Sequence, residues 1–261
     1  LARSVAGKGI MVEKKIIMRI KMVIIDVHTH LSGRAGPASK LIEYMDAAGV
    51  DKAFVLSYDI EEAINEFPDR LIPFVYFDPR NEGEHLERID RYVKEYWWKG
   101  VKVGHQCAVA RWMYPMMEKA QEYGLEVVIH SDHSVMNHPY IIGDIANSFP
   151  MVKTVILHMG GGTCFDSELL SIKMAEKNPN IYLETCYSNP YNIAKALREI
   201  GAERVMYGSD YSNNGYASRF DKPGQYLEIM LDAVRVIDLP KEEEVMVLGG
   251  TAAKLMGVET K

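Results

Sequence analysis

The chain has 261 residues, of which 48% are hydrophobic and 25% are charged, a composition typical of globular proteins. This length suits either two small domains or one larger α/β barrel. The net charge of −6, without a basic cluster, argues against nucleic acid as a partner, and no apolar run reaches the roughly 20 residues needed to cross a bilayer.

Residues 1–21 precede the first clear element. Charged residues such as Glu13, Lys15 and Arg19 interrupt the apolar ones, so the segment lacks the continuous apolar core of an export signal. The alternation from Ile16 to Met22 indicates an added strand. A cloning remnant, an upstream start and a disordered tail are equally compatible with this segment.

From Met22 onward, short apolar or β-branched runs alternate with longer amphipathic segments. Eight runs predict strands, at residues 22–28, 52–57, 71–77, 100–104, 125–130, 153–158, 181–185 and 204–210. Helices are expected between them. The helix expected at residues 37–50 starts near Pro37, and the one at 114–124 starts near Pro115, a common helix-opening residue.

Strands joined by helices of this length are parallel, and their crossovers are right-handed. Eight such units close a (β/α)8 TIM barrel of the α/β class. A doubly wound open sheet is the competing architecture, but it usually has fewer strands, and no Gly-x-Gly-x-x-Gly follows the first strand. No low-complexity linker interrupts residues 22–261, so we expect a single barrel domain there, preceded by a tail or extra strand at 1–21.

Polar side chains stand at or near the ends of five predicted strands. They are His28, His30, Lys102, His130, His158 and Asp210. Active sites of TIM barrels form at the carboxyl ends of the strands, so we expect these side chains to meet at one rim.

Alternation along a strand predicts which way each side chain points. Val101 and Val103 should face the helices, which leaves Lys102 facing the barrel axis, where a buried ammonium is costly unless it is paired, neutralised or modified. On the first strand the same rule places the polar residues inward and the apolar ones toward the helices; these sets are Asp26, His28 and His30, and Val23, Ile25 and Val27.

Imidazole nitrogens and carboxylates are ligands that suit zinc and other first-row divalent ions. The candidate ligands are His28, His30, His130 and Asp210. A bound ion would lower the pKa of its water toward about 7 and so supply a nucleophile. Any one histidine alone is more often a hydrogen-bonded or surface residue, but their joint occurrence at strand ends favours a metal centre.

These motifs resemble the amidohydrolase superfamily, in particular its amidohydrolase 2 branch of metal-dependent hydrolases and decarboxylases. The resemblance covers residues 22–258 and implies a TIM-barrel fold. It is carried, in order, by "DVHTH", "MDAAGVDKAFVLS", "FPDRLIPFVYFDPR", "KGVKV", "VVIH", "VILHMGGG", "IGAERVMYGSDYS" and "GGTAAKLMGV".

The resemblance implies a role for each polar strand end. It makes His28, His30, His130 and Asp210 the metal ligands. His158 would bind a second metal or act as a base and hydrogen-bond donor beside the activated water. Lys102 stands where two-metal members hold a carbamylated lysine; with a single metal, the commoner arrangement in this branch, it would contact substrate. We expect one zinc ion, with Mn²⁺, Fe²⁺, Co²⁺ or Ni²⁺ as alternatives and a second metal left open.

Three positions depart from the branch pattern. No His-Pro follows Lys102, Ser212 stands where proline is common, and Thr251 stands where asparagine is common. None of these is an expected ligand. Loops after strand ends shape the substrate pocket, so the resemblance does not extend to a particular subfamily.

Hydrolysis is the leading hypothesis. A metal-bound hydroxide attacks the carbonyl of an amide, ester or lactone in a small substrate, Asp210 takes the water proton and passes it to the leaving group, and His158 stabilises the developing charge. The alternative is non-oxidative decarboxylation of a small carboxylated aromatic or muconate-like substrate, which needs a cation for the carboxylate. Candidate cations near strand ends are Arg34, Arg80, Arg111 and Arg219. A metal-binding barrel without activity is the third hypothesis; the filled polar positions argue against it.

Several residues are weaker candidates for substrate contact because they only follow or end a predicted strand. They are His105, His133, Arg111 and Glu184. Asp26 lies two residues before His28 and is expected to orient a histidine or Lys102 rather than to bind metal.

The three cysteines, Cys107, Cys164 and Cys186, are odd in number and widely spaced, so no disulfide framework is expected. A reducing compartment, the cytoplasm, fits this pattern. Short loops after the strands indicate a small-molecule substrate, and the aromatic run at 96–98 leaves a homo-oligomer open.

Overall fold

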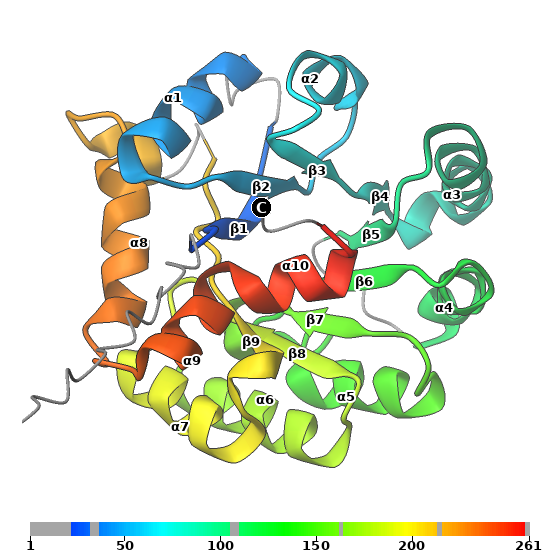
Figure 1. Ribbon diagram of the computed structural model, residues 1–261. Helices are drawn as coiled ribbons and strands as arrows, with labels where there is room; N and C mark the ends of the chain where they lie inside the picture. Colours follow the sequence, from blue (N-terminus) through cyan, green and yellow to red (C-terminus); the bar gives the residue numbers. More distant parts are fainter. Residues whose placement is uncertain (1–21, 32–36, 105–109, 162–163, 213–215, 259–261) are drawn as a thin grey trace, which may run out of the picture.

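The computed structural model describes residues 22–31, 37–104, 110–161, 164–212 and 216–258 (Figure 1). Its strands are β1 (Ile25–Thr29), β2 (Lys52–Val55), β3 (Leu71–Pro73), β4 (Val75–Phe77), β5 (Gly100–Val103), β6 (Glu126–Ile129), β7 (Thr154–Ile156), β8 (Ile181–Glu184) and β9 (Val205–Met206). Each predicted strand is confirmed, and the run at 71–77 is divided into β3 and β4.

Helices follow the strands and surround them in Figure 1. The α-helices are α1 (Ala38–Ala48), α2 (Glu61–Glu66), α3 (Glu82–Tyr96), α4 (Ala110–Tyr123), α5 (Pro139–Ser148), α6 (Phe165–Lys177), α7 (Pro190–Ile200), α8 (Gln225–Arg235), α9 (Lys241–Val245) and α10 (Thr251–Met256). Shorter helical turns are η1 (Pro79–Asn81), η2 (Leu157–Gly160), η3 (Ala202–Arg204) and η4 (Tyr216–Arg219), and η5 (Met246–Gly250) is a π-helix.

The strands are parallel and pair in chain order, as β1-β2-β3 and as β4 through β9. A single residue, Phe74, joins β3 to β4, and its N–H donates to the Val55 carbonyl (3.2 Å). On the other side, the Val27 N–H donates to the Tyr207 carbonyl (3.1 Å), which links β1 to the segment after β9. The fold is a TIM barrel, as predicted.

The break between β3 and β4 has a local cause. Pro73 has no N–H for the strand ladder, and the next side chain, Phe74, packs against the backbone of Gly100 on β5. A methyl group added to Gly100 would lie 2.1 Å from the Phe74 ring, so only glycine leaves room for this ring.

Two buried clusters separate the inside of the barrel from its outside. Val101 and Val103 belong to the outer cluster with helix residues such as Met116, which confirms the predicted direction of this strand and leaves Lys102 inside. The inner cluster contains Phe54, Val128, Val155 and Met206 from the strands together with Ala252 and Leu255 from α10. We infer that α10 covers the amino-terminal end of the barrel, where its neighbour η5 contacts β1 and β9.

The predicted direction of the apolar side chains of the first strand is wrong. Val23, Ile25 and Val27, expected to face the helices, all belong to the inner cluster, and Ile24 belongs to the outer one. The register between β1 and β2 shifts between Asp26 and Thr29, so strict alternation does not continue through this strand. This irregularity lets His28 reach the interior although Ile25 and Val27 also do.

The predicted start of the helix at 114–124 is also wrong. The helix α4 begins at Ala110, and Pro115 lies inside it. Proline removes one helical hydrogen bond there, but Met113, Met116 and Ala120 are buried along the same helix and offset that loss.

Two further expectations have different outcomes. Among the described residues, no helix is both long and apolar enough to span a membrane. The tail or extra strand expected at residues 1–21 lies outside the described residues.

Candidate metal centre and active site

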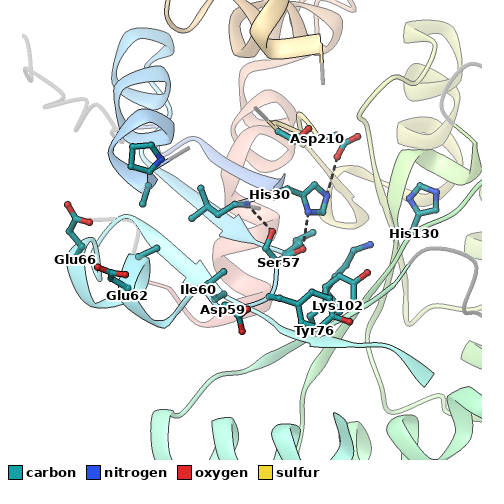
Figure 2. A pocket seen from close by; sticks show the side chains of 17 residues that line it. His30, Ser57, Asp59, Ile60, Glu62, Glu66, Tyr76, Lys102, His130 and Asp210 are labelled. Carbon is teal, nitrogen blue, oxygen red and sulfur yellow. Dashed lines mark hydrogen bonds and ion pairs between the residues drawn. The ribbon is translucent and has the colours of Figure 1, made fainter. Parts of the chain in front are cut away.

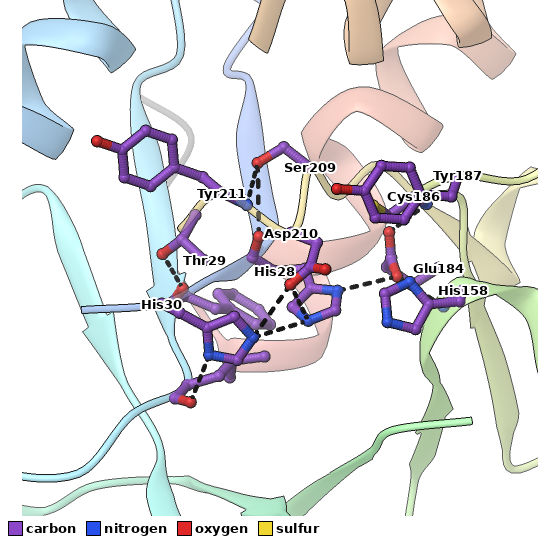
Figure 3. Close-up of polar contacts among 12 residues, drawn as sticks. His28, Thr29, His30, His158, Glu184, Cys186, Tyr187, Ser209, Asp210 and Tyr211 are labelled. Carbon is purple, nitrogen blue, oxygen red and sulfur yellow. Dashed lines mark hydrogen bonds and ion pairs between the residues drawn. The ribbon is translucent and has the colours of Figure 1, made fainter. Parts of the chain in front are cut away.

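Three donor atoms converge at the carboxyl end of the barrel (Figure 3). The Nε2 atoms of His28 and His30 lie 3.1 Å apart, and each lies 3.2 Å from Oδ1 of Asp210. We call these residues the His28–His30–Asp210 trio. His28 and His30 come from the end of β1 and Asp210 from the segment after β9, so closure of the barrel is what brings them together.

The other ring nitrogen of each histidine has an acceptor of its own. Nδ1 of His28 lies 3.2 Å from Oε2 of Glu184, and Nδ1 of His30 lies 2.9 Å from the Leu56 carbonyl. These partners assign the proton of each neutral imidazole to Nδ1 and leave a lone pair on Nε2. Two lone pairs and a carboxylate oxygen therefore point at one another, an arrangement that a cation stabilises.

The spacing of the trio fits a first-row divalent ion. Ligands about 2.1 Å from such an ion are roughly 3.0 to 3.4 Å apart at octahedral to tetrahedral angles. The observed 3.1 and 3.2 Å separations lie within that range. The residues present therefore suit a metal, with nitrogen and oxygen donors of the kind that zinc and manganese accept.

Asp26 holds the backbone of the trio together. It is fully buried, and its Oδ1 accepts from the N–H groups of His28 (3.0 Å) and Ser209 (2.9 Å). Its Oδ2 accepts from the Ser209 hydroxyl (2.5 Å). Asp26 thus ties the end of β1 to the residue before Asp210 through backbone and hydroxyl groups. Its predicted role of orienting a histidine or Lys102 stays a prediction.

The backbone of Asp210 is unusual. Its φ angle is 53°, in the left-handed region that non-glycine residues rarely adopt. The Tyr226 hydroxyl donates to the carbonyl of the preceding residue, Ser209 (2.6 Å), and the Tyr187 and Tyr226 hydroxyls lie 2.7 Å apart. Strained backbone held by buried hydrogen bonds is common at functional sites.

Burial and neighbouring groups set the charge states of His28 and Asp210. Burial lowers the pKa of His28 well below its usual value, so its imidazole is neutral at neutral pH. Burial by itself would raise the pKa of Asp210, but the nearby imidazoles of His28 and His30 outweigh it and hold that pKa below its usual value. A neutral His28 imidazole beside an ionised Asp210 carboxylate is the combination that binds metal.

His158 lies beside the trio on η2, directly after β7. Its ring centroid is 4.9 Å from that of His28 and 4.9 Å from that of His130. Its φ angle of 56° is left-handed, and its buried Nδ1 atom has no hydrogen-bond partner among the described residues. Burial lowers the pKa of His158 to about 4, so the ring is neutral at pH 7 and offers one donor and one acceptor.

His130 lies apart from the convergent atoms. In the described part of the chain, the trio forms a group of mutually close donor atoms that does not include His130. Its Nε2 atom lies 3.4 Å from Oδ2 of Asp132 instead. The role of His130 as a fourth ligand stays a prediction.

A pocket of about 970 Å³ opens beside the trio (Figure 2). Its wall includes His30, Lys102, His130 and Asp210, so four of the predicted strand-end residues share one cavity. Lys102 is only 3% exposed. The pocket is large enough for a small organic substrate.

The comparison with protein families agrees with this geometry. A model of the amidohydrolase family matches residues 57–258, more than three quarters of the chain. The chain belongs to the amidohydrolase family. Members of this family are enzymes that act as hydrolases or decarboxylases, and divalent metal dependence occurs among them.

Solved structures share the fold. A TIM-barrel protein from Bordetella bronchiseptica has a TM-score of 0.72 and 16% identity, over 90% of this chain and 98% of that one. A 5-carboxyvanillate decarboxylase from Novosphingobium aromaticivorans, complexed with manganese, has a TM-score of 0.68 and 14% identity, over 92% and 97% of the two chains. A probable 2-pyrone-4,6-dicarboxylic acid hydrolase from Acinetobacter baumannii has a TM-score of 0.65 and 16% identity, over 90% and 100%.

The remaining predicted residues of this amidohydrolase have varied positions. His133 is exposed and does not line the pocket described above. Glu184 is fully buried beside His28 and His158, away from the pocket wall. Arg80 pairs with Asp78. Arg111 lies in α4 without a described side chain, and His105, Arg34 and Cys107 lie outside the described residues.

Sequence reasoning missed part of the pocket. Asp59, Glu62 and Glu66 line it from α2 and the turn before it. Asp59 follows the predicted strand at 52–57, but no strand end marks Glu62 or Glu66. Tyr76 also lines it. Because Tyr76 pairs with Lys102 in the β4–β5 register, alternation along 71–77 was the signal that would have found it.

Proposed function

We propose that this chain is a metal-dependent hydrolase that acts on the carbonyl of an amide, ester or lactone in a small substrate. The observation that carries the proposal is the His28–His30–Asp210 trio, whose lone pairs converge beside a pocket. A single zinc ion held by the trio, with His130 as a fourth ligand, is our proposed cofactor. Mn²⁺, Fe²⁺, Co²⁺ and Ni²⁺ suit the same donors.

A divalent ion held there would supply Lewis acidity, which lowers the pKa of water and polarises a carbonyl oxygen. The protein supplies the proton transfer. Asp210 lines the pocket and is ionised, so it can take a proton from attacking water and pass it to the leaving group. Hydrogen bonds that join Ser209 to Asp26 and Tyr226 restrain the backbone that carries this carboxylate.

His158 and Lys102 complete the proposed site. His158 is neutral, so it would steady developing charge by donating a hydrogen bond rather than by carrying a positive charge. Lys102 lies inside the barrel on the pocket wall and would contact a substrate oxygen. We place it there rather than as a carbamylated bridge between two metals, since the trio accounts for one ion.

Decarboxylation of a small carboxylated substrate is the second candidate. One observation favours it: Lys102 offers a buried cation on the pocket wall where a carboxylate would enter. The 5-carboxyvanillate decarboxylase from Novosphingobium aromaticivorans shares the fold, so decarboxylation is compatible with this barrel.

One experiment separates the two reactions. The metal-loaded protein is incubated in ¹⁸O-labelled water with a panel of lactones, esters, amides and aromatic carboxylic acids. Hydrolysis predicts ¹⁸O in the acid product, and decarboxylation predicts carbon dioxide release with no ¹⁸O in the remaining organic product. Turnover of aromatic acids alone, with carbon dioxide released, would overturn the hydrolase proposal.

The role of Asp210 is tested by Asp210→Asn. The variant keeps the size of the side chain but loses the group that accepts the proton, so we expect turnover to fall by about 10²–10⁴-fold or more. Circular dichroism checks that the variant is folded. Wild-type turnover by a folded variant would remove Asp210 from the mechanism.

A further inference from the structure

Glu184 stands out as a buried carboxylate that the proposed reaction does not use. It ends β8, is 0% exposed, and does not line the pocket. Its two carboxylate oxygens have different partners. Oε1 accepts from the Cys186 N–H, and Oε2 accepts from the His158 N–H (2.8 Å) and lies 3.2 Å from Nδ1 of His28 (Figure 3).

The contact with His28 decides which nitrogen of that ring carries the proton. Oε2 of Glu184 already accepts from the His158 N–H, and with Nδ1 of His28 as the second donor to this oxygen the lone pair of that ring remains on Nε2. That lone pair is the one that points toward His30 and Asp210. The opposite tautomer would place a proton where a metal has to bind.

The contact with His158 fixes a second residue of the site. His158 and Met159 are consecutive non-glycine residues with left-handed φ angles of 56° and 45°. Such a turn is costly and persists only where surrounding contacts hold it. The bond from the His158 N–H to Glu184 is one of these contacts.

Glu184 also packs against the approach to Asp210. A methyl group added to Gly208 would lie 2.4 Å from Oε1 of Glu184, so the carboxylate packs closely against the Gly208 backbone. One side chain therefore contacts, or nearly contacts, the segments that carry His28, His158 and Asp210.

We propose that Glu184 is a positioning residue, which holds His28 in the Nδ1-protonated tautomer and His158 in its left-handed turn so that the trio can bind metal. The inference rests on the proposed metal site. It assigns Glu184 a task other than contact with substrate. Carboxylates that accept from the second nitrogen of a ligand histidine commonly strengthen metal binding.

The test compares Glu184→Gln with Glu168→Gln. In E184Q one oxygen replaces two, so the Cys186 N–H competes with His158 and His28 for it. Glu168 is a matched control: it is 0% exposed on α6, and it accepts from the side chain of Asn192 (2.6 Å) and the N–H of Asn189, away from the trio. Loss of a buried carboxylate is thus common to both variants.

Two readouts are taken at pH 8. Long-range ¹H–¹⁵N NMR of the histidine rings in metal-free protein reports the tautomer of His28, assigned through loss of its signals in His28→Gln. A competition titration with a chelating dye reports zinc affinity. We expect E184Q to lose the pure Nδ1–H form and to bind zinc about 10- to 100-fold more weakly, while E168Q keeps both properties of the wild type.

The outcomes separate this inference from the proposed function. If wild-type protein binds zinc and folded E184Q matches it in tautomer and affinity, the positioning role is wrong. Equal losses in E168Q and E184Q would make the effect a general one of buried carboxylates and would also overturn the inference. If the wild type binds no metal while the tautomer still changes in E184Q, the tautomer role stands and the metal site fails.

Discussion

Buried carboxylates at both ends of the barrel have raised pKa values, although their partners differ. At the carboxyl end, Asp26 and Glu184 are fully buried, and burial raises the pKa of each to about 7, although backbone N–H donors lower it in part. At the amino end, Glu126 begins β6, and burial likewise raises its pKa to about 7. Its Oε1 atom lies 3.2 Å from the Lys153 ammonium, while its buried Oε2 atom has no hydrogen-bond partner among the described residues.

Glu126 predicts a dependence of stability on pH. Between about 4.5 and about 7 the folded protein keeps a proton on Glu126 that the unfolded chain has lost, so the free energy of unfolding falls as pH rises through this window. Glu126→Gln removes that contribution. We expect E126Q to gain about 2 kcal/mol relative to wild type on going from pH 5 to pH 8, measured by urea unfolding. The exposed Glu87→Gln is the control, and a pH-independent difference in E126Q would refute this account.

Alternation along a strand predicted which way its side chains point only where the strand is regular. Lys102 faces inward between Val101 and Val103, as alternation predicts. On β1 the same rule fails, because a register shift between Asp26 and Thr29 has no signal in the apolar pattern. The sequence predicted His28 and His30 as ligands both from their position at a strand end and from a shared strand face, and the ligand role stays a prediction.

At the scale of elements, the amino end of the barrel depends on close packing by η5 and α10. Gly249 lies in η5 against β1. A methyl group at this position would lie 2.0 Å from the carbonyl oxygen of Val23 and 3.2 Å from the Ile25 nitrogen, so it would overlap backbone atoms. The Thr251 hydroxyl also donates to the Ala202 carbonyl (2.9 Å) and so joins α10 to the turn before β9.

Two glycine substitutions test this packing. Gly249→Ala should lower the free energy of unfolding by about 1–3 kcal/mol or more, because the added methyl group overlaps backbone atoms. Gly83→Ala on α3 is the matched control, since nothing lies within 4 Å of the added atom, and it should leave stability unchanged or raise it by up to about 1 kcal/mol. Denaturant unfolding measures both, and equal effects would count against a closed end.

The sequence predicted that each strand exists, but it predicted the ends of the helices less well. Apolar runs located every strand, because a buried parallel strand needs them on both faces. The start of α4 was predicted at Pro115 because proline usually opens a helix. Here Pro115 lies inside the helix, where buried apolar side chains stabilise the helix around it. The contribution of α2 to the pocket was not predictable from motifs, because Glu62 and Glu66 read as an ordinary solvated helix surface.

At the scale of the molecule, the site exists only because the sheet closes on itself. Hydrogen bonds from Val27 and His30 to Tyr207 and Tyr211 bring the first strand beside the segment after the last one. Structures with 14% to 16% identity keep the same barrel, so the fold tolerates wide change in sequence. Motif resemblance could indicate the ligand set, whereas the distances within it depend on that closure.

We propose that the His28–His30–Asp210 trio binds one divalent metal ion. The most direct measurement is zinc stoichiometry and affinity, determined by titration of metal-stripped protein at pH 8 and by elemental analysis. His30→Ala removes a trio member, and His133→Ala removes an exposed histidine outside the pocket as a matched control. We predict one tightly bound ion in wild type and H133A and loss of tight binding in folded H30A. Absence of binding in the wild type under all loading conditions, or equal binding in H30A, would contradict the claim.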